Sequence, residues 1–158
     1  MDKTKKIVEI LTKKNKTIST MESCTGGAIA STITNVEGAS KVLRFSAITY
    51  SNEYKIKMGV SKEIIDKYSV YSKNTAQAMA KAISNYTNSN YALGITGKLN
   101  RPDDNNPAGK DNEVFYSIFD SDKNQYYDYI IKVNDSSREK NKKEIVEQII
   151  ETLYEILK

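Results

Sequence analysis

The chain has 158 residues and a formal net charge of +4, from 24 basic and 20 acidic side chains, a length that suits one compact domain. It contains one cysteine and no histidine, which excludes an intrachain disulfide, a serine–histidine catalytic device and histidine-ligated metal sites. No apolar run is long enough to cross a bilayer and no charged-then-apolar leader is evident, so we expect a cytoplasmic protein without membrane association.

Periodicity predicts the elements in chain order. Ile7, Ile10 and Leu11 recur at helical spacing and predict a leading helix capped by Asp2 or Thr4. Next come a predicted strand over 17–22, a tight turn over 23–27, a helix over 28–34, a strand over 42–50, a short helix capped by Ser61, a longer helix capped by Asn74 or Thr75, a buried strand over 91–96, a loop over 98–112, a hairpin with strands over 114–119 and 125–133, and an amphipathic helix over 139–157. This order predicts an α/β protein: a three-layer α/β/α sandwich with a mixed central sheet, forming a single domain over 1–158.

The turn Glu22–Gly27 places polar residues and two glycines between a strand and a helix. Glycine lets the backbone approach a ligand closely, and the start of a helix presents N–H groups that suit a phosphate or an oxyanion. Ser23 could direct its hydroxyl to the same place; the simpler interpretation is a hydroxyl that caps the helix. Cys24 could also be a nucleophile at a helix start, but the chain has no histidine to pair with it.

A second polar cluster, Tyr50-Ser51-Asn52-Glu53-Tyr54-Lys55, follows the second expected strand. A serine hydrolase without histidine needs another base, and lysine serves when burial or a nearby cation keeps it uncharged. A tyrosine hydroxyl can relay a proton or protonate a leaving group. The alternative is a lysine that is simply exposed at a strand-to-helix junction.

Together the two clusters resemble the C-terminal domain of the competence-damage protein CinA, a family that includes nicotinamide mononucleotide deamidases. The resemblance rests on Glu-Ser-Cys-Thr-Gly-Gly, followed 27 residues after its serine by Tyr-Ser-Asn-Glu-x-Lys, and it covers nearly the whole chain. It implies that Ser23 attacks a carboxamide, that Lys55 is its base and that Tyr50 passes a proton to departing ammonia. The substrate-binding residues that it implies are Cys24, Thr25, Gly26, Gly27, Asn52, Thr96 and Arg138.

The resemblance also implies the reaction and the partners. Nicotinamide mononucleotide and water would give nicotinic acid mononucleotide and ammonia, with no cofactor and no metal ion. Backbone amides near Thr25 and Gly26 are expected to hold the oxyanion. The symmetric assemblies of the family indicate a homodimer.

One loop departs from the family pattern. Over Lys98–Gly109 the expected glycines are mostly replaced, and Asp103 and Asp104 add negative charge where a phosphate is expected. Two alternatives therefore stay open: a nucleotide-binding relative without turnover, and an amidase that acts on a different amidated small molecule. Basic and acidic residues alternate along the last helix, so we expect no nucleic-acid partner.

Overall fold

The computed structural model describes residues 2–100, 110–134 and 137–158. Among these residues, a five-stranded sheet has the order β2-β1-β3-β4-β5. Its strands are β1 (Ile18–Glu22), β2 (Ser46–Ile48), β3 (Tyr91–Gly97), β4 (Glu113–Asp120) and β5 (Gln125–Lys132). β1 runs parallel to β2 and β3, whereas β4 is antiparallel to β3 and β5. The predicted mixed sheet is confirmed.

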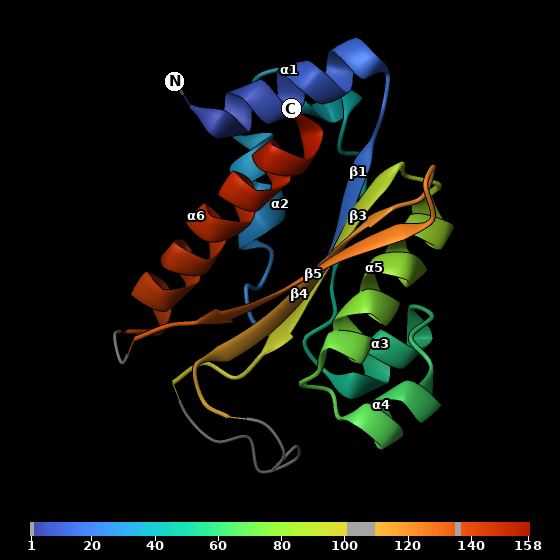
Figure 1. Cartoon of the computed structure of the whole chain (residues 1–158), viewed down its shortest axis with the longest axis vertical. Coiled ribbons are helices and arrows are strands. Elements are labelled where there is room, and N and C mark those ends of the chain that lie inside the picture. Colours follow the sequence, from blue (N-terminus) through green and yellow to red (C-terminus); the bar gives the residue numbers. More distant parts are fainter. Residues whose placement is uncertain (1, 101–109, 135–136) are drawn as a thin grey trace.

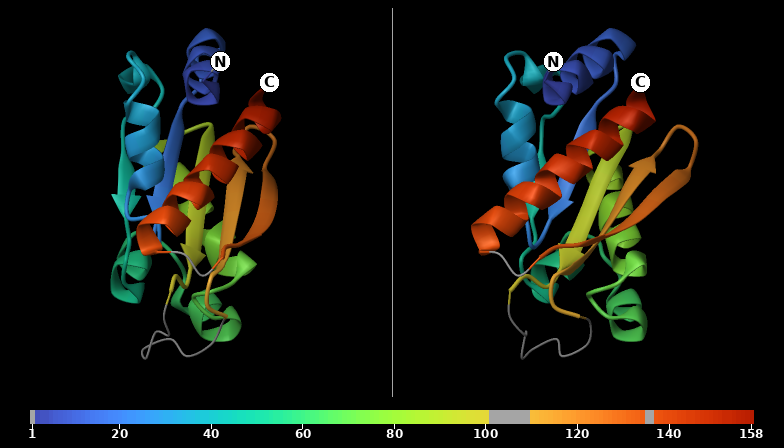
Figure 2. Two further views of the ribbon diagram at one scale, coloured as in Figure 1. Left: turned by 90° about the vertical axis from the view of Figure 1, so that its left-hand side faces the viewer. Right: turned by 60° about the vertical axis from the view of Figure 1, so that its left-hand side comes forward.

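Helices cover both faces of this sheet, as Figures 1 and 2 show. One face carries α1 (Lys3–Lys14), α2 (Ala28–Thr34) and α6 (Arg138–Leu157), and the other carries α3 (Asn52–Lys57), α4 (Lys62–Tyr68) and α5 (Lys73–Thr87). A short 3-10 turn, η1 (Ala39–Lys41), lies between α2 and β2. The predicted three-layer α/β/α sandwich is therefore confirmed.

Each face of the sheet has its own hydrophobic core. Ile7, Ile29 and Ile149 are fully buried in the cluster under α1, α2 and α6. Met21 and Met79 belong to the cluster on the other face, which α5 covers. A Cβ on Gly94 would lie 2.2 Å from the carbonyl oxygen of Ala76, so only glycine lets α5 pack this closely against β3.

The predicted leading helix and its cap are confirmed, because the Asp2 side chain accepts a hydrogen bond from the Thr4 amide at 2.9 Å. The predicted cap of α5 is wrong by two or three residues. Ser72, not Asn74 or Thr75, is the N-cap, and its hydroxyl accepts from the Thr75 amide.

The second strand is shorter than the 42–50 predicted, because its apolar residues serve a turn as well as a strand. Val42 ends η1 and is fully buried in the core, and the strand itself covers only Ser46–Ile48. α3 was not predicted as a helix; Ser51 caps it by accepting from the Tyr54 amide.

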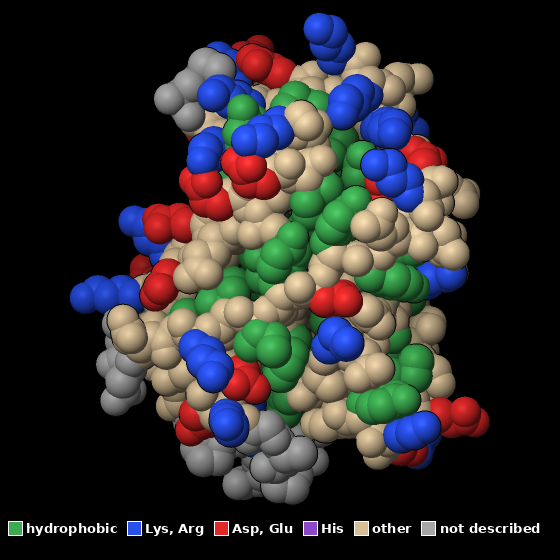
Figure 3. Space-filling model, in the orientation of Figure 1, with side chains coloured by type: hydrophobic (Ala, Val, Ile, Leu, Met, Phe, Trp, Pro, Cys, Tyr) green, Lys and Arg blue, Asp and Glu red, His purple; other side chains and the backbone are tan. Residues whose placement is uncertain are grey.

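The surface over the β5 edge is apolar, and its margin is charged. Figure 3 shows hydrophobic side chains in a band across the middle of this face, with basic and acidic side chains interspersed around them. Ile130 of β5 is 58% exposed. The face in this view has no continuous basic stripe of the kind that nucleic-acid binding requires.

Candidate active site

Ser23 and Lys55 meet at the carboxyl end of β1, although 32 residues separate them. The Lys55 Nζ lies 3.1 Å from the Ser23 Oγ and donates to the Thr49 carbonyl at 2.7 Å. Lys55 is 1% exposed and Ser23 is 8% exposed. A lysine amine held against a serine hydroxyl away from bulk water has the geometry of a nucleophile and its base.

Strand alternation explains why these side chains meet. Met21 packs in the cluster under α5, and Ser23, two residues further along, points to the same face of the sheet. α3 lies on that face, and Lys55 is its buried residue. The cap at Ser51 fixes where this short helix begins and therefore where the amine lies.

The Glu22 carboxylate organises the turn that carries Ser23. It is fully buried and accepts hydrogen bonds from the hydroxyls of Thr20 and Thr25 and from the amides of Ile29 and Ala30, at distances of 2.7–3.0 Å. A carboxylate at the start of α2 is stabilised by the helix dipole as well as by these bonds. The start of α2 is therefore occupied by a side chain of the protein itself.

Two backbone amides of the turn in which we expect an oxyanion to be held already have partners. The Gly26 amide donates to the Ser23 carbonyl at 2.9 Å, and the Ala28 amide donates to the Thr25 carbonyl at 3.1 Å. Thr25 is fully buried with its hydroxyl on Glu22, so its observed role is to support the turn.

The two glycines adopt positive φ angles, 60° at Gly26 and 95° at Gly27. A Cβ on Gly26 would lie 3.3 Å from the Lys142 Nζ of α6, so that amine stands directly over the turn. A Cβ on Gly27 would lie 2.9 Å from the Ile48 Cδ1, which explains the second glycine by the close approach of β2.

Tyr50 does not join the serine and lysine in this structure. Ile48 faces α2, and Tyr50, two residues further along, follows it to that side of the sheet, opposite to Lys55. The Tyr50 side chain is exposed, and its hydroxyl accepts a hydrogen bond from the Arg138 guanidinium at 2.9 Å.

Tyr50 and Arg138 border a cavity of about 640 Å³ between α2 and α6. Its lining residues are Cys24, Ala28, Ser31, Thr32, Tyr50, Arg138, Glu139, Lys142, Lys143, Val146 and Glu147. Because Cys24 follows Ser23 directly, this cavity begins on the other side of the same turn. Three basic residues and two glutamates line it, so its lining carries a net positive charge, which together with its apolar wall suits a ligand with a ring and an anionic group.

Cys24 is unsuited to be the nucleophile. Its side chain is 5% exposed, and burial raises the pKa of its thiol to about 12. Nearby basic side chains lower this pKa, but by less than burial raises it. The thiol is therefore protonated at neutral pH.

Thr96 and Asn52 are the remaining predicted substrate-binding residues. Thr96 is fully buried at the end of β3, and its hydroxyl donates to the Val70 carbonyl at 3.0 Å. Asn52 is the first residue of α3 and is half-buried. Residues 101–109, which contain the divergent part of the predicted loop, lie outside the described residues.

Sequence reasoning missed Thr49. Its carbonyl binds Lys55, and its side chain is 1% exposed on the same face as Ser23. The signal was available in strand alternation, because Ala47 belongs to the cluster under α5 and Thr49 follows it at a spacing of two.

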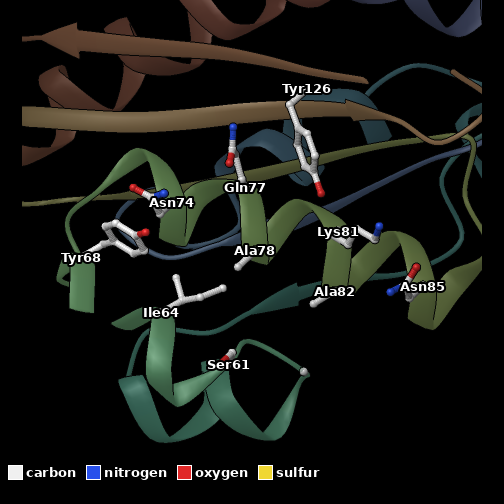
Figure 4. Close-up of a pocket in the computed structure, with 11 residues that line it drawn as sticks. Ser61, Ile64, Tyr68, Asn74, Gln77, Ala78, Lys81, Ala82, Asn85 and Tyr126 are labelled. Atoms are coloured by element: carbon white, nitrogen blue, oxygen red, sulfur yellow. The ribbon is translucent and has the colours of Figure 1, made fainter. Parts of the chain in front are cut away.

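A further surface hollow of about 350 Å³ lies between α4, α5 and β5 (Figure 4). Gln77 and Tyr126 stand on one side of it, and Ile64 and Tyr68 stand on the other. Neither Ser23 nor Lys55 lines it, so it is separate from the candidate active site.

The model of the CinA C-terminal domain family matches residues 1–157. The chain belongs to this family. A CinA-like protein of Flavobacterium psychrophilum is 42% identical over 122 residues, which cover 74% of this chain and 28% of that protein. A CinA-like protein of Kosmotoga olearia is 48% identical over 92 residues, which cover 58% of this chain and 22% of that protein. The chain thus spans less than a third of the length of these CinA relatives.

Solved structures of the CinA superfamily share the fold. The competence or damage-inducible protein of Enterobacter asburiae superposes with a TM-score of 0.90 at 19% identity, covering 99% of this chain and 96% of that one. The CinA superfamily protein of Escherichia coli gives a TM-score of 0.86 at 24% identity, covering 98% of this chain and 88% of that one. The described residues contain no helix long and apolar enough to span a membrane.

Proposed function

We propose that this chain is an amidohydrolase that removes ammonia from the carboxamide of a nucleotide, with nicotinamide mononucleotide as its substrate. The observation that carries the proposal is the 3.1 Å contact between the buried Lys55 amine and the Ser23 hydroxyl. Membership of the CinA family supports the same reaction, because the resemblance implies it for these two residues.

The first half of the proposed reaction forms an acyl-enzyme. Burial penalises the charged form of a lysine, which leaves the Lys55 amine uncharged and able to accept a proton. The amine takes the hydroxyl proton while Ser23 Oγ forms a bond to the carboxamide carbon. The carbon–nitrogen bond then breaks, and the departing nitrogen receives the proton and leaves as ammonia. Lys55 is thereby returned to its uncharged form.

The second half releases the acid. Water forms a bond to the acyl carbon, its proton passes through Lys55 to Ser23 Oγ, and the ester bond breaks. The products are nicotinic acid mononucleotide and the free enzyme. No other reactant is consumed.

Tyr50 and Arg138 are proposed to hold the rest of the nucleotide. The sequence suggested Tyr50 as a proton donor, but its hydroxyl accepts from Arg138 in the cavity between α2 and α6. Arg138 and Lys142 supply positive charge for a phosphate there. The homodimer implied by the family stays a prediction.

Incubation of the purified chain with nicotinamide mononucleotide tests the substrate. We expect equal amounts of ammonia and nicotinic acid mononucleotide, with much slower release from free nicotinamide, because the phosphate would have no partner. Calorimetric binding of the mononucleotide without ammonia would contradict the proposal and favour a binding-only relative. Ammonia from another amidated nucleotide alone would contradict the substrate but not the chemistry.

A further inference from the structure

The hydroxyl of Thr49 is buried and has no hydrogen-bond partner in the part of the chain that the structure describes. Thr49 is 1% exposed, and its Oγ1 bonds to no group among the described residues. Buried polar groups in native proteins are nearly always paired, because an unpaired group destabilises the fold. The presence of threonine at this position is therefore not explained by its contribution to stability.

Thr49 lies directly beside the nucleophile. The register of β1 and β2 pairs Glu22 with Ile48, and the Thr49 amide donates to the Glu22 carbonyl at 2.8 Å. One residue further along each strand, Ser23 and Thr49 are neighbours. Adjacent strands lie roughly 4.8 Å apart, so side chains on the same face at these two positions can contact one small group.

The Thr49 side chain also faces the base. Ala47 and Met21 both pack in the cluster under α5, so Thr49 and Ser23, each two residues on, share that face. The Lys55 Nζ binds the Thr49 carbonyl at 2.7 Å and the Ser23 hydroxyl at 3.1 Å. The Lys55 amine therefore bonds to both of these neighbouring residues.

We infer that the Thr49 hydroxyl accepts a hydrogen bond from the amide nitrogen of the substrate and so selects carboxamides over esters. This inference rests on the proposed function. Lys55 takes the serine proton and must deliver it to the leaving nitrogen, so that nitrogen has to lie on the Lys55 side of the reacting carbon. Thr49 holds Lys55 on that side, and its unpaired oxygen can accept an N–H of the carboxamide.

An ester gives a direct contrast, because its leaving oxygen carries no hydrogen to donate. The chemistry at Ser23 is otherwise the same: Oγ forms a bond to the carbonyl carbon, the carbon–oxygen bond breaks, and the proton held by Lys55 leaves with the alcohol. Removal of the Thr49 hydroxyl should therefore slow the hydrolysis of nicotinamide mononucleotide but not that of the methyl ester of nicotinic acid mononucleotide.

The test compares Thr49→Val, which keeps the shape and removes the hydroxyl, with Thr49→Ser, which keeps the hydroxyl. We expect Thr49→Val to lower kcat for the carboxamide by about tenfold, the effect of one hydrogen bond to the transition state, and to change kcat for the ester by less than about twofold. Thr49→Ser should restore the carboxamide rate. The thermal midpoint of Thr49→Val should not fall, since the lost hydroxyl had no partner.

An unchanged carboxamide rate in Thr49→Val, or an equal loss for both substrates, would overturn the inference. If Thr49→Val folds poorly, Thr49→Ala gives the same comparison between carboxamide and ester. A wild-type protein that hydrolyses neither substrate would defeat the proposed function, and this inference with it. A wild-type protein that releases ammonia while Thr49→Val does so equally well would defeat the inference alone.

Discussion

Ser23 and Cys24 are neighbouring residues that both carry a nucleophilic atom, but their surroundings differ. Ser23 contacts a lysine amine, whereas burial raises the pKa of the Cys24 thiol to about 12. A thiol with this pKa supplies almost no thiolate at neutral pH, so the serine is the better nucleophile in this turn.

We therefore expect Cys24→Ala to keep ammonia release within about threefold of wild type, a loss that reflects packing alone. Iodoacetamide at neutral pH should leave the native protein unmodified, as mass spectrometry of the peptide containing Cys24 would show. Inactivation by iodoacetamide together with loss of activity in Cys24→Ala would instead point to the thiol.

At the scale of elements, the α2 helix depends on Glu22. Each carboxylate oxygen accepts from one threonine hydroxyl and one backbone amide of α2 or its turn. Glu22→Gln replaces one of these oxygens with an NH₂ group, which would face a backbone N–H that also donates. The buried backbone amide on that side would lose its acceptor, whereas the threonine hydroxyl can reorient and accept from the NH₂ group.

We expect Glu22→Gln to lower the free energy of unfolding by about 3 kcal/mol, as measured by urea denaturation. Glu53→Gln is the matched control, because Glu53 is exposed and its ion pair with Lys57 lies on the surface of α3. The control should lose less than about 1 kcal/mol. Equal losses in the two variants would show that the buried carboxylate does not support the turn.

At the scale of the whole molecule, alkaline pH should weaken the fold through Tyr116. Burial raises the pKa of its phenol from 10.0 to about 12, and its hydroxyl lies 2.7 Å from the Thr152 hydroxyl of α6. The folded protein holds this proton more tightly than the unfolded chain. The contribution of Tyr116 to the free energy of unfolding is therefore complete below pH 10.0 and is lost as the pH rises towards about 12.

Urea denaturation over this alkaline range measures the effect. Wild type should lose more stability than Tyr116→Phe, which has no phenol to ionise. A fall of the same size in both proteins would assign the alkaline effect to other groups whose pKa is raised by burial, such as Tyr91, Tyr126 and Cys24.

The long elements of this fold could be predicted from the sequence, because a repeated apolar spacing sets both their type and their buried face. This holds for α1, α6 and the hairpin of β4 and β5. The two motifs also predicted that Ser23 and Lys55 belong together, and the structure places them in contact.

The rest depends on contacts that linear sequence does not encode. Tyr50 and Lys55 share a motif, yet strand alternation sends Tyr50 to the opposite face of the sheet from the serine. The Glu22 carboxylate reaches the first amides of α2 only because the turn between them folds back. Strand alternation places Thr49 on the same face as Ser23, but only the folded chain shows that its hydroxyl is buried without a partner among the described residues.

The central claim is that a buried lysine activates Ser23, and the rate of ammonia release from nicotinamide mononucleotide by Lys55→Met measures it most directly. Methionine fills a similar volume without an amine, and Lys57→Met, on the exposed side of the same helix, is the control. The account predicts that Lys55→Met and Ser23→Ala lose at least about a thousandfold in rate while Lys57→Met keeps it. A folded Lys55→Met protein that releases ammonia at nearly the wild-type rate would contradict the account.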